Sequence, residues 1–390
     1  MLFLVNGCND TPNSIGKGTQ PPEDDGVIHI DTMYATAHST VPNLIFTTSI
    51  DRFMLGKYKT YQAWACLKFY SWPDSMVGAK ITSATIQLKG VYHFGDSLAP
   101  LSFNAYRAMS NLFLSDSLTY DSLNGNIVNS AHGVHYNASP LPLQTYIPIG
   151  DTESVTIQIL DTTMLREWFS TNTDTTDLND GLVLRPTNSS SIRGFYSFNA
   201  SDTAYLPTLY VTYEDSNGNT LSYSHKIGRS EYVSTVDQAS LISDTKFIYI
   251  QNGISYRGLV SFDSIPTPWP VSIHRAVLQV TLNASQSSVQ LAPFFHDSLY
   301  ALSVGVNEKS DGMAFALSQQ SNDSSGHLMY SFETGGKGEI AARMLSKASV
   351  QKILLSGFSE SGSFDLHTLY GAFSGIKLKP RLIITYSVQR

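Results

Sequence analysis

Hydrophobic and polar residues alternate with period two along many short segments of this chain, which is typical of β-strands. In residues 63–69 (AWACLKF), Leu67 and Phe69 share one face of the expected strand, and Trp64 and Lys68 share the other. Gly, Pro, Asn and Asp, which form turns readily, separate these segments. The pattern therefore predicts an all-β fold made of short strands.

The same order of strands occurs twice along the chain. Each copy contains two alternating strands separated by a proline-containing turn, and each copy ends with a strand that follows a proline. The matched segments are 63–69 with 256–262, 79–88 with 271–280, and LPTLYVTY (206–213) with KPRLIITY (379–386). This internal repeat predicts two domains of one architecture.

Many short strands with turn signals predict that each domain is a β-sandwich of the jelly-roll type. We place the domains at 27–215 and 222–390, with the second more divergent, and a linker at 216–221 where Asn and Gly give a strong turn signal. Each copy also contains one segment with helical spacing, at 161–169 (DTTMLREWF) and 338–347 (GEIAARMLSK). We therefore expect two tandem sandwiches, each with one short helix.

The first 26 residues have a different character. Residues 1–8 are similar to the end of a truncated export signal with a lipobox, in which Cys8 would become lipidated, and residues 9–26 have the composition of a flexible tether. These features predict an exported lipoprotein on the outer membrane or cell surface, attached to the membrane only through its lipid. The alternatives for Cys8 are a free thiol on a tail or a disulfide with Cys66, which lies in a predicted strand.

Composition excludes several classes of protein. Hydrophobic residues make up 42% of the chain and charged residues 15%, whereas an average globular protein is about 25% charged. The net charge is −7 with only 25 Lys and Arg residues in total, so a basic surface for nucleic acid is not expected. No run approaches 18 consecutive apolar residues, so no membrane-spanning helix is expected either.

The sequence contains no recognisable catalytic motif. The acidic residues are scattered through predicted loops rather than paired as in glycosidases, and neither HExxH nor GxSxG occurs. One acidic cluster, Asp174, Asp177 and Asp180 with Asn179, offers the oxygen ligands that Ca²⁺ prefers. We expect a non-enzymatic protein without a cofactor. We interpret the acidic cluster as a solvated turn before the strand that begins near Gly181, and a structural Ca²⁺ site is the alternative.

A series of segments in the first copy resembles the segment order of a known family. They read LGKY (55–58), AWACLKFYSWP (63–73), GAKITSATIQL (78–88), VTIQILDTTMLREWF (155–169), DGLVLRP (180–186), FYSFNA (195–200) and LPTLYVTY (206–213). This order resembles the DNRLRE family of extracellular modules, a branch of which is classed among carbohydrate-binding modules. The resemblance covers the first domain and extends more weakly over the second. It implies a β-jelly-roll, export, and a non-catalytic role in binding polysaccharide or anchoring surface material.

The resemblance also concerns one basic position. Family members commonly carry an arginine just before the Leu-x-Phe strand, and the second copy keeps it as Arg257, whereas Trp64 replaces it in the first copy.

Two functions follow from these observations. The first is polysaccharide binding, for which the candidate residues are Trp64, Lys68, Tyr70, Tyr58 and Arg257, because exposed aromatic rings stack on sugar C–H groups. The alternative for Trp64 is that a loop or the second domain covers it. The second function is that of a structural subunit of a surface layer, filament or adhesin that binds other cell-surface protein chains. A shallow groove with exposed aromatic and basic side chains would favour the first function, and an open edge strand would favour the second.

Overall fold

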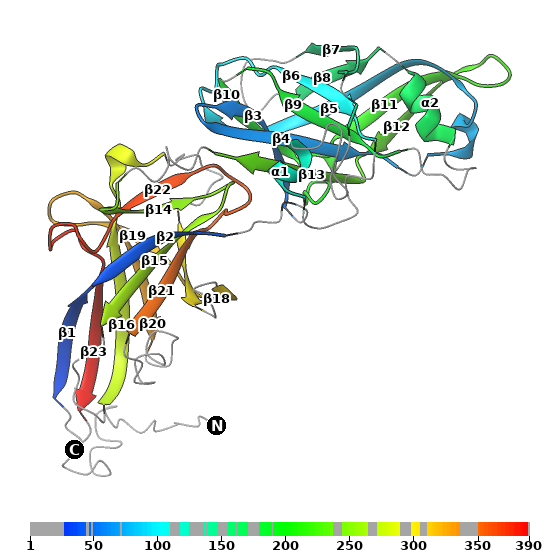
Figure 1. The fold of residues 1–390 in the computed structure, drawn as a ribbon. Helices are drawn as coiled ribbons and strands as arrows, with labels where there is room; N and C mark the ends of the chain where they lie inside the picture. The colour runs from blue at the N-terminus through cyan, green and yellow to red at the C-terminus, as the bar shows by residue number, and fades with distance from the viewer. Residues whose placement is uncertain are drawn as a thin grey trace, which may run out of the picture.

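The structure is a computed structural model. It describes residues 27–43, 47, 50–70, 72–109, 118–124, 136–137, 139–146, 154–160, 162–170, 179–188, 190–236, 244–263, 271–288, 298–304, 310–335 and 350–388. Within these residues the chain is all-β, and its strands form two β-sandwiches that meet end to side (Figure 1). The predicted fold class is confirmed.

The first sandwich is organised by one long strand, β5 (Lys80–Gly95), which takes part in both of its layers. The first half of β5 pairs with β11 (Thr208–Glu214) and β8 (Ser154–Ile159), and its second half pairs with β10 (Ser191–Tyr196). The register of β5 shifts against both β11 and β10. A strand that bends in this way joins the two layers into one continuous 11-stranded sheet.

The other strands extend these layers. β12 pairs with β11, β7 pairs with β8, and the second layer continues in the order β10-β3-β4-β9-β6, with β13 also pairing β4. Their bounds are β3 Arg52–Tyr58, β4 Tyr61–Lys68, β6 Phe103–Arg107, β7 Leu143–Tyr146, β9 Leu182–Pro186, β12 Thr220–Lys226 and β13 Arg229–Thr235.

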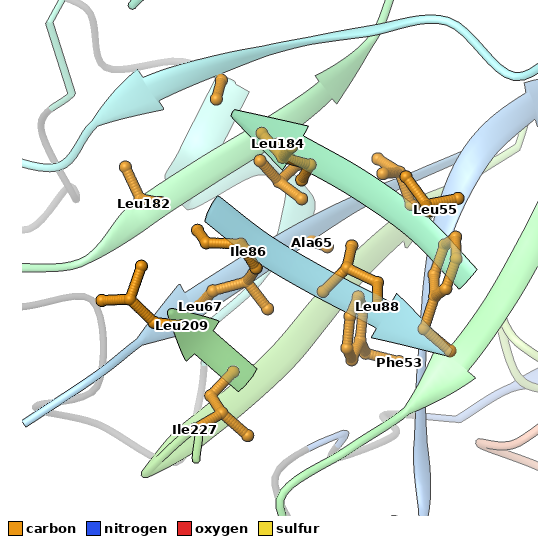
Figure 2. Packing of buried hydrophobic residues seen from close by; sticks show 14 of the residues in the cluster. Phe53, Leu55, Ala65, Leu67, Ile86, Leu88, Leu182, Leu184, Leu209 and Ile227 are labelled. Atoms are coloured by element: carbon orange, nitrogen blue, oxygen red, sulfur yellow. The ribbon is translucent and has the colours of Figure 1, made fainter. Parts of the chain in front are cut away.

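The core of the first sandwich lies where the alternation predicted it. Leu67 of β4 and Phe69, directly after β4, are fully buried, as are Ile86 and Leu88 of β5 and Leu209 of β11. Figure 2 shows most of these side chains converging between the layers. Period two places every second side chain of a strand on the same face, so the apolar positions of both layers meet in one core.

The second sandwich has two separate layers. One has the order β1-β23-β16-β20-β19, and the other has the order β18-β17-β21-β15-β14-β22 with β2 pairing β15. Their bounds are β1 Ile28–Tyr34, β2 Ala37–Pro42, β14 Phe247–Gln251, β15 Tyr256–Asp263, β16 Val271–Thr281, β17 Leu299–Val304, β18 Ser310–Leu317, β19 Gln319–Asn322, β20 Leu328–Gly335, β21 Val350–Gly357, β22 Leu366–Tyr370 and β23 Arg381–Val388. The predicted core residues of β15 and β16 are buried between these layers.

Helices are few and short. α2 (Thr163–Ser170) confirms the helix predicted at 161–169, and its Trp168 is buried in the first core. α1 (Tyr120–Asn124) was not predicted. The described residues also contain three 3₁₀ turns, namely η1 (Asp74–Met76), η2 (Thr203–Tyr205) and η3 (Ala284–Gln286). The helix predicted at 338–347, the tether at 9–26 and Cys8 lie outside the described residues.

The strands do not follow the predicted domain boundaries at 27–215 and 222–390. β1 and β2, from the start of the first copy, pair with β23 and β15 of the second sandwich. β12 and β13, from the start of the second copy, pair with β11 and β4 of the first sandwich. The sequence repeat is therefore offset from the structural units, because each copy donates its first two strands to the other copy's sandwich.

The two sandwiches meet through an aromatic contact. Phe364 is fully buried and packs against the rings of Tyr61 and Phe94 of the first sandwich, with centroids 6.2 and 5.8 Å away. The backbone N–H of Phe364 also donates to the hydroxyl of Tyr92 at 2.8 Å. Burial at this interface raises the pKa of Tyr61 to about 12. No helix among the described residues is long and apolar enough to cross a membrane.

Candidate functional site

Trp64 does not present a face to solvent. Its side chain is fully buried on the outer side of β4, under a small third layer that includes α1. The ring of Tyr120 contacts it edge-on at 5.2 Å, and the guanidinium of Arg185 lies 4.7 Å from its ring centroid. The sequence prediction of a ligand platform at Trp64 is therefore corrected: the alternative, in which other parts of the chain cover it, describes this residue.

The neighbouring candidates do not form a site with Trp64. Lys68 is buried, and Tyr58 packs edge-on against Phe94 with centroids 5.5 Å apart. Tyr70 is 41% exposed, but its hydroxyl donates to the backbone oxygen of Gly228 at 3.0 Å. The residues that the alternation places on the outer face do not form one surface. Trp64 is covered by the third layer, whereas Tyr70 lies just after the end of β4.

Arg257 forms an ion pair rather than an exposed basic site. Its Nε and Nη2 donate to the two carboxylate oxygens of Glu360 at 2.7 and 2.6 Å. The hydroxyl of Ser255 donates to the same carboxylate at 2.7 Å. This two-point pair fixes the chain after β21 against β15 in the second sandwich, so Arg257 has a structural role.

The predicted Ca²⁺ cluster is only partly described. Asp174 and Asp177 lie outside the described residues, while Asp180 and Asn179 lie within them. The amide nitrogen of Asn179 donates to the backbone oxygen of Phe69, which ties this segment to the end of β4. Among the residues that the structure describes, no group of His, Cys, Asp or Glu has the arrangement of a metal site. The calcium site remains a prediction.

A groove with aromatic walls lies on the solvent face of the layer that contains β5, β8 and β11. It has a volume of about 190 Å³, and we call it the tyrosine groove. The groove is lined by Gln87, Lys89, Ser154, Ala204, Tyr205, Leu206, Thr208 and Tyr210. Tyr205 and Tyr210 are 43% and 44% exposed.

Local sequence explains why these side chains point outward. On β11, Leu209 and Val211 are buried, so the intervening Tyr210 faces solvent. On β5, Ile86 and Leu88 are buried, so Gln87 faces solvent beside them. The strand register places the outward residues of neighbouring strands directly opposite one another, with Thr208 opposite Gln87. The floor of the groove is thus a regular array of hydroxyl and amide groups.

The wall of the groove comes from the turn before β11. Asp202 caps η2 by accepting a hydrogen bond from the backbone of Ala204 at 2.9 Å. One face of the Tyr205 ring stacks on Tyr196, with centroids 5.2 Å apart and planes at 23°. Support from Tyr196 restricts the orientation of the Tyr205 ring.

The second sandwich does not repeat this chemistry. The positions equivalent to Tyr210 and Tyr205 are Ile383 and Leu378 in the alignment of LPTLYVTY (206–213) with KPRLIITY (379–386), extended by one residue at its start. There Arg381 donates to Gln279 at 2.7 Å, across the face that corresponds to the groove floor. The tyrosine groove is therefore a property of the first sandwich, not of the repeated architecture.

Sequence reasoning missed the groove although the signal for half of it was present. The alternation that placed Leu209 in the core also assigns Tyr210 to the wet face of the same strand. It does not reveal that β5 and β11 are neighbours, or that a turn brings Tyr205 beside them.

No protein-family model matches this chain, and no curated protein matches it either. Among solved structures, the chain is 9% identical to the C-terminal domain of the antigen I/II polypeptide BspA of Streptococcus agalactiae, covering 86% of this chain and 90% of that one, with a TM-score of 0.16. The C-terminal domain of the antigen I/II-family protein AspA of Streptococcus pyogenes is 9% identical, covering 87% and 92%, with a TM-score of 0.15. A DUF4466 family protein from Parabacteroides merdae is 10% identical, covering 79% and 98%, with a TM-score of 0.15. TM-scores this low carry no conclusion about function.

Proposed function

We propose that this chain is a non-catalytic, surface-exposed protein that binds extracellular polysaccharide in the tyrosine groove. The observation that carries the proposal is the pairing of two exposed tyrosine rings, Tyr205 and Tyr210, with a polar floor that includes Gln87 and Lys89.

The chemistry of the groove suits a sugar chain. The exposed face of an aromatic ring stacks on the C–H face of a pyranose, which is apolar, while amides and hydroxyls bond the sugar hydroxyls. Gln87 supplies both a donor and an acceptor, and Thr208 supplies a hydroxyl. Lys89 adds a positive charge, which favours polysaccharides that carry carboxylate or sulfate groups.

A shallow groove gives weak binding at a single site. Multiple copies on one surface would compensate for this weakness, because linked sites raise the effective concentration of the next binding event. A lipidated Cys8 on the tether would provide such a display, so the lipid anchor is part of the proposal. Metabolic labelling with a lipid precursor tests it, with labelling expected in the full chain and none in a Cys8→Ala variant.

Binding is tested on a polysaccharide array with the full chain and with Tyr205→Ala and Tyr210→Ala. Loss of one stacking contact, at about 1.4 kcal/mol, corresponds to about tenfold weaker binding. Phe373→Ala is the matched control, because it removes a ring that is 67% exposed on the second sandwich. Binding to no polysaccharide, or equal binding by all the variants, would contradict the proposal.

A structural subunit is the second candidate function, and one observation favours it. β1 is the terminal strand of its layer, and among the described residues no strand pairs with its outer edge. Ile28 and Ile30 on this strand are 65% and 68% exposed. Open edges of this kind pair readily with other chains. A surface layer or filament requires self-association, which sedimentation of the full chain at increasing concentration measures directly.

A further inference from the structure

The chain contains two copies of one two-strand unit, and each is docked on a sandwich in the same way. β1 and β12 are both seven residues long, and two residues join each to the next strand. At the joint, the N–H of Ala35 donates to the oxygen of Pro380 at 2.8 Å, and the N–H of Ile227 donates to that of Pro207 at 2.8 Å. The two prolines are the equivalent residues at the entrances of β23 and β11.

The second strands of the units also match. The N–H of Thr36 donates to the oxygen of Ser261 at 2.9 Å, and the N–H of Gly228 donates to that of Lys68 at 3.1 Å. Ser261 and Lys68 occupy equivalent positions on β15 and β4, and the pairing then continues in the same register along both strands. The unit β1–β2 and the unit β12–β13 are therefore interchangeable in backbone geometry.

The two units differ in how firmly they are anchored. β13 contributes a run of buried residues that includes Tyr232 and Val233, whereas no side chain of β2 is fully buried. β12 also follows β11 directly through a tight turn, in which the carboxylate of Asp215 accepts from the N–H groups of Asn217 and Asn219 at 2.9 and 2.8 Å. The unit β12–β13 is thus fixed to the first sandwich by its core contacts and by its turn.

β1–β2 is held by hydrogen bonds and by a few partly buried side chains. Met33 packs against the core of the second sandwich, Val41 packs against a small apolar cluster on the other face of β15, and the His29 ring stacks on Tyr386 with centroids 5.3 Å apart. Besides the two strand ladders, the hydroxyl of Tyr386 donates to Asp31 at 2.8 Å, and Thr36 donates to Asp263 at 3.1 Å. The N–H of Ala372 donates to Nδ1 of His38 at 3.0 Å. In the joint between the strands only Ala35 is buried in the second core. The same segment of another copy would reproduce every one of these contacts.

The connection from β2 to the first sandwich is short. Asn43 is held by the second sandwich, since its N–H donates to the oxygen of Ser255 at 2.9 Å. Four positions later, the hydroxyl of Thr47 donates to the backbone oxygen of Tyr232 on β13 at 2.6 Å. Short hinges between separately anchored units favour domain swapping, because exchange relieves the constraint without losing contacts.

We propose that β1–β2 is an exchangeable unit through which copies of this chain assemble, with β1–β2 of one copy completing the second sandwich of another. Reciprocal exchange gives a closed dimer, and one-way exchange gives an open chain of copies. This assembly is independent of sugar binding, because the tyrosine groove lies on the first sandwich. The partner is a second copy because the contacts of β1–β2 are specific to β23 and β15.

The test uses pairs of cysteines across the ladder. Thr32 on β1 lies opposite Ile383 on β23, and Ser224 on β12 lies opposite Tyr210 on β11 at the equivalent position. Cβ atoms of such partners are about 4.5–5.5 Å apart, close enough for a disulfide after small adjustment. All variants carry Cys8→Ser. The native Cys66 does not compete, because it is buried and burial raises its thiol pKa far above the usual range.

Two full-length chains that each carry one introduced cysteine, Thr32→Cys in one and Ile383→Cys in the other, are mixed at high concentration under mild oxidation, with no polysaccharide present. We expect a mixed disulfide dimer between them, at least fivefold above that of either chain alone. The matched control mixes Ser224→Cys with Tyr210→Cys and should give no mixed dimer, because β12–β13 does not exchange. A chain that carries both Thr32→Cys and Ile383→Cys, or both Ser224→Cys and Tyr210→Cys, should form the disulfide within itself. This result verifies that the two positions of each pair are close enough to be joined.

A further variant raises the rate of exchange. A Cβ on Gly371 would lie 2.3 Å from Nε2 of His38, so Gly371→Ala displaces His38 and weakens the docking of β2. We expect it to increase the yield of the mixed Thr32–Ile383 dimer at short times. The proposal is overturned if the double variant closes its disulfide while the mixture forms no dimer. It is equally overturned if the control mixture forms as much dimer as the test mixture.

Discussion

Replacing Trp64 with alanine separates a structural role from a binding role. The side chain is fully buried, and its ring is enclosed by Tyr120, Tyr136 and the guanidinium of Arg185. Truncating a buried tryptophan costs about 3–5 kcal/mol, through the lost contacts and the cavity that remains. We expect Trp64→Ala to lower the free energy of unfolding of the first sandwich by about this amount.

Trp64→Phe is the graded control. The indole N–H of Trp64 has no hydrogen-bond partner among the described residues, so phenylalanine removes an unsatisfied donor along with part of the ring. Its cost should be smaller, at about 1–2 kcal/mol.

Urea unfolding followed by circular dichroism measures the free energy of unfolding of both Trp64 variants, and a polysaccharide titration measures affinity under conditions where each variant is folded. Affinity should stay within about twofold of the original chain, since the tyrosine groove is on the other layer. A variant with unchanged stability and lost affinity would refute this reasoning and restore Trp64 as a ligand contact.

Three further predictions concern the second sandwich and its interface. Arg257→Ala leaves the carboxylate of Glu360 without its two-point partner, and should lower the free energy of unfolding by about 2 kcal/mol without changing polysaccharide affinity; a selective loss of affinity would contradict this role. Burial lowers the pKa of His38 below 6.5, so docking of β2 is fully stabilised above pH 6.5 and loses this stabilisation as the pH falls through the lowered pKa. Amide exchange of β2 should accelerate below pH 6.5, and a His38→Asn variant, whose amide oxygen can replace Nδ1 as acceptor, should not show this dependence. Phe364→Ala removes the ring at the contact between the sandwiches, and small-angle scattering should show a broader distribution of shapes; an unchanged profile would mean that other contacts fix the interface.

The sequence predicted which face of a strand each side chain occupies better than it predicted which other segments pack against that face. Period two places Leu67 inward and Trp64 outward, and both assignments are confirmed. What covers Trp64 was not predictable, because the covering layer includes Tyr120, which is far away in the sequence and lies in a helix too short to leave a periodic signal.

The sequence repeat indicated two sandwiches but not which strands belong to each. In the sequence repeat, β1–β2 precede the matched segments of the first copy, and β12–β13 precede those of the second copy. The repeat therefore assigns each pair of strands to the copy that follows it in the chain. Which sandwich a strand joins depends on long-range pairing, such as that of Thr32 with Ile383. The alternation of a strand does not tell which distant strand it pairs with, so only the structure shows that each two-strand unit lies on the sandwich of the other copy.

The central claim is that a polysaccharide occupies the tyrosine groove, and oxidative footprinting of tyrosine side chains tests it most directly. Tyr205, Tyr210 and Tyr70 are 43%, 44% and 41% exposed, so they should react at similar rates in the free protein. With the polysaccharide that binds best on the array, we predict that oxidation of Tyr205 and Tyr210 falls severalfold while that of Tyr70, which lies outside the groove, is unchanged. Equal reactivity of all three with and without the polysaccharide, or protection of Tyr70 alone, would contradict the claim.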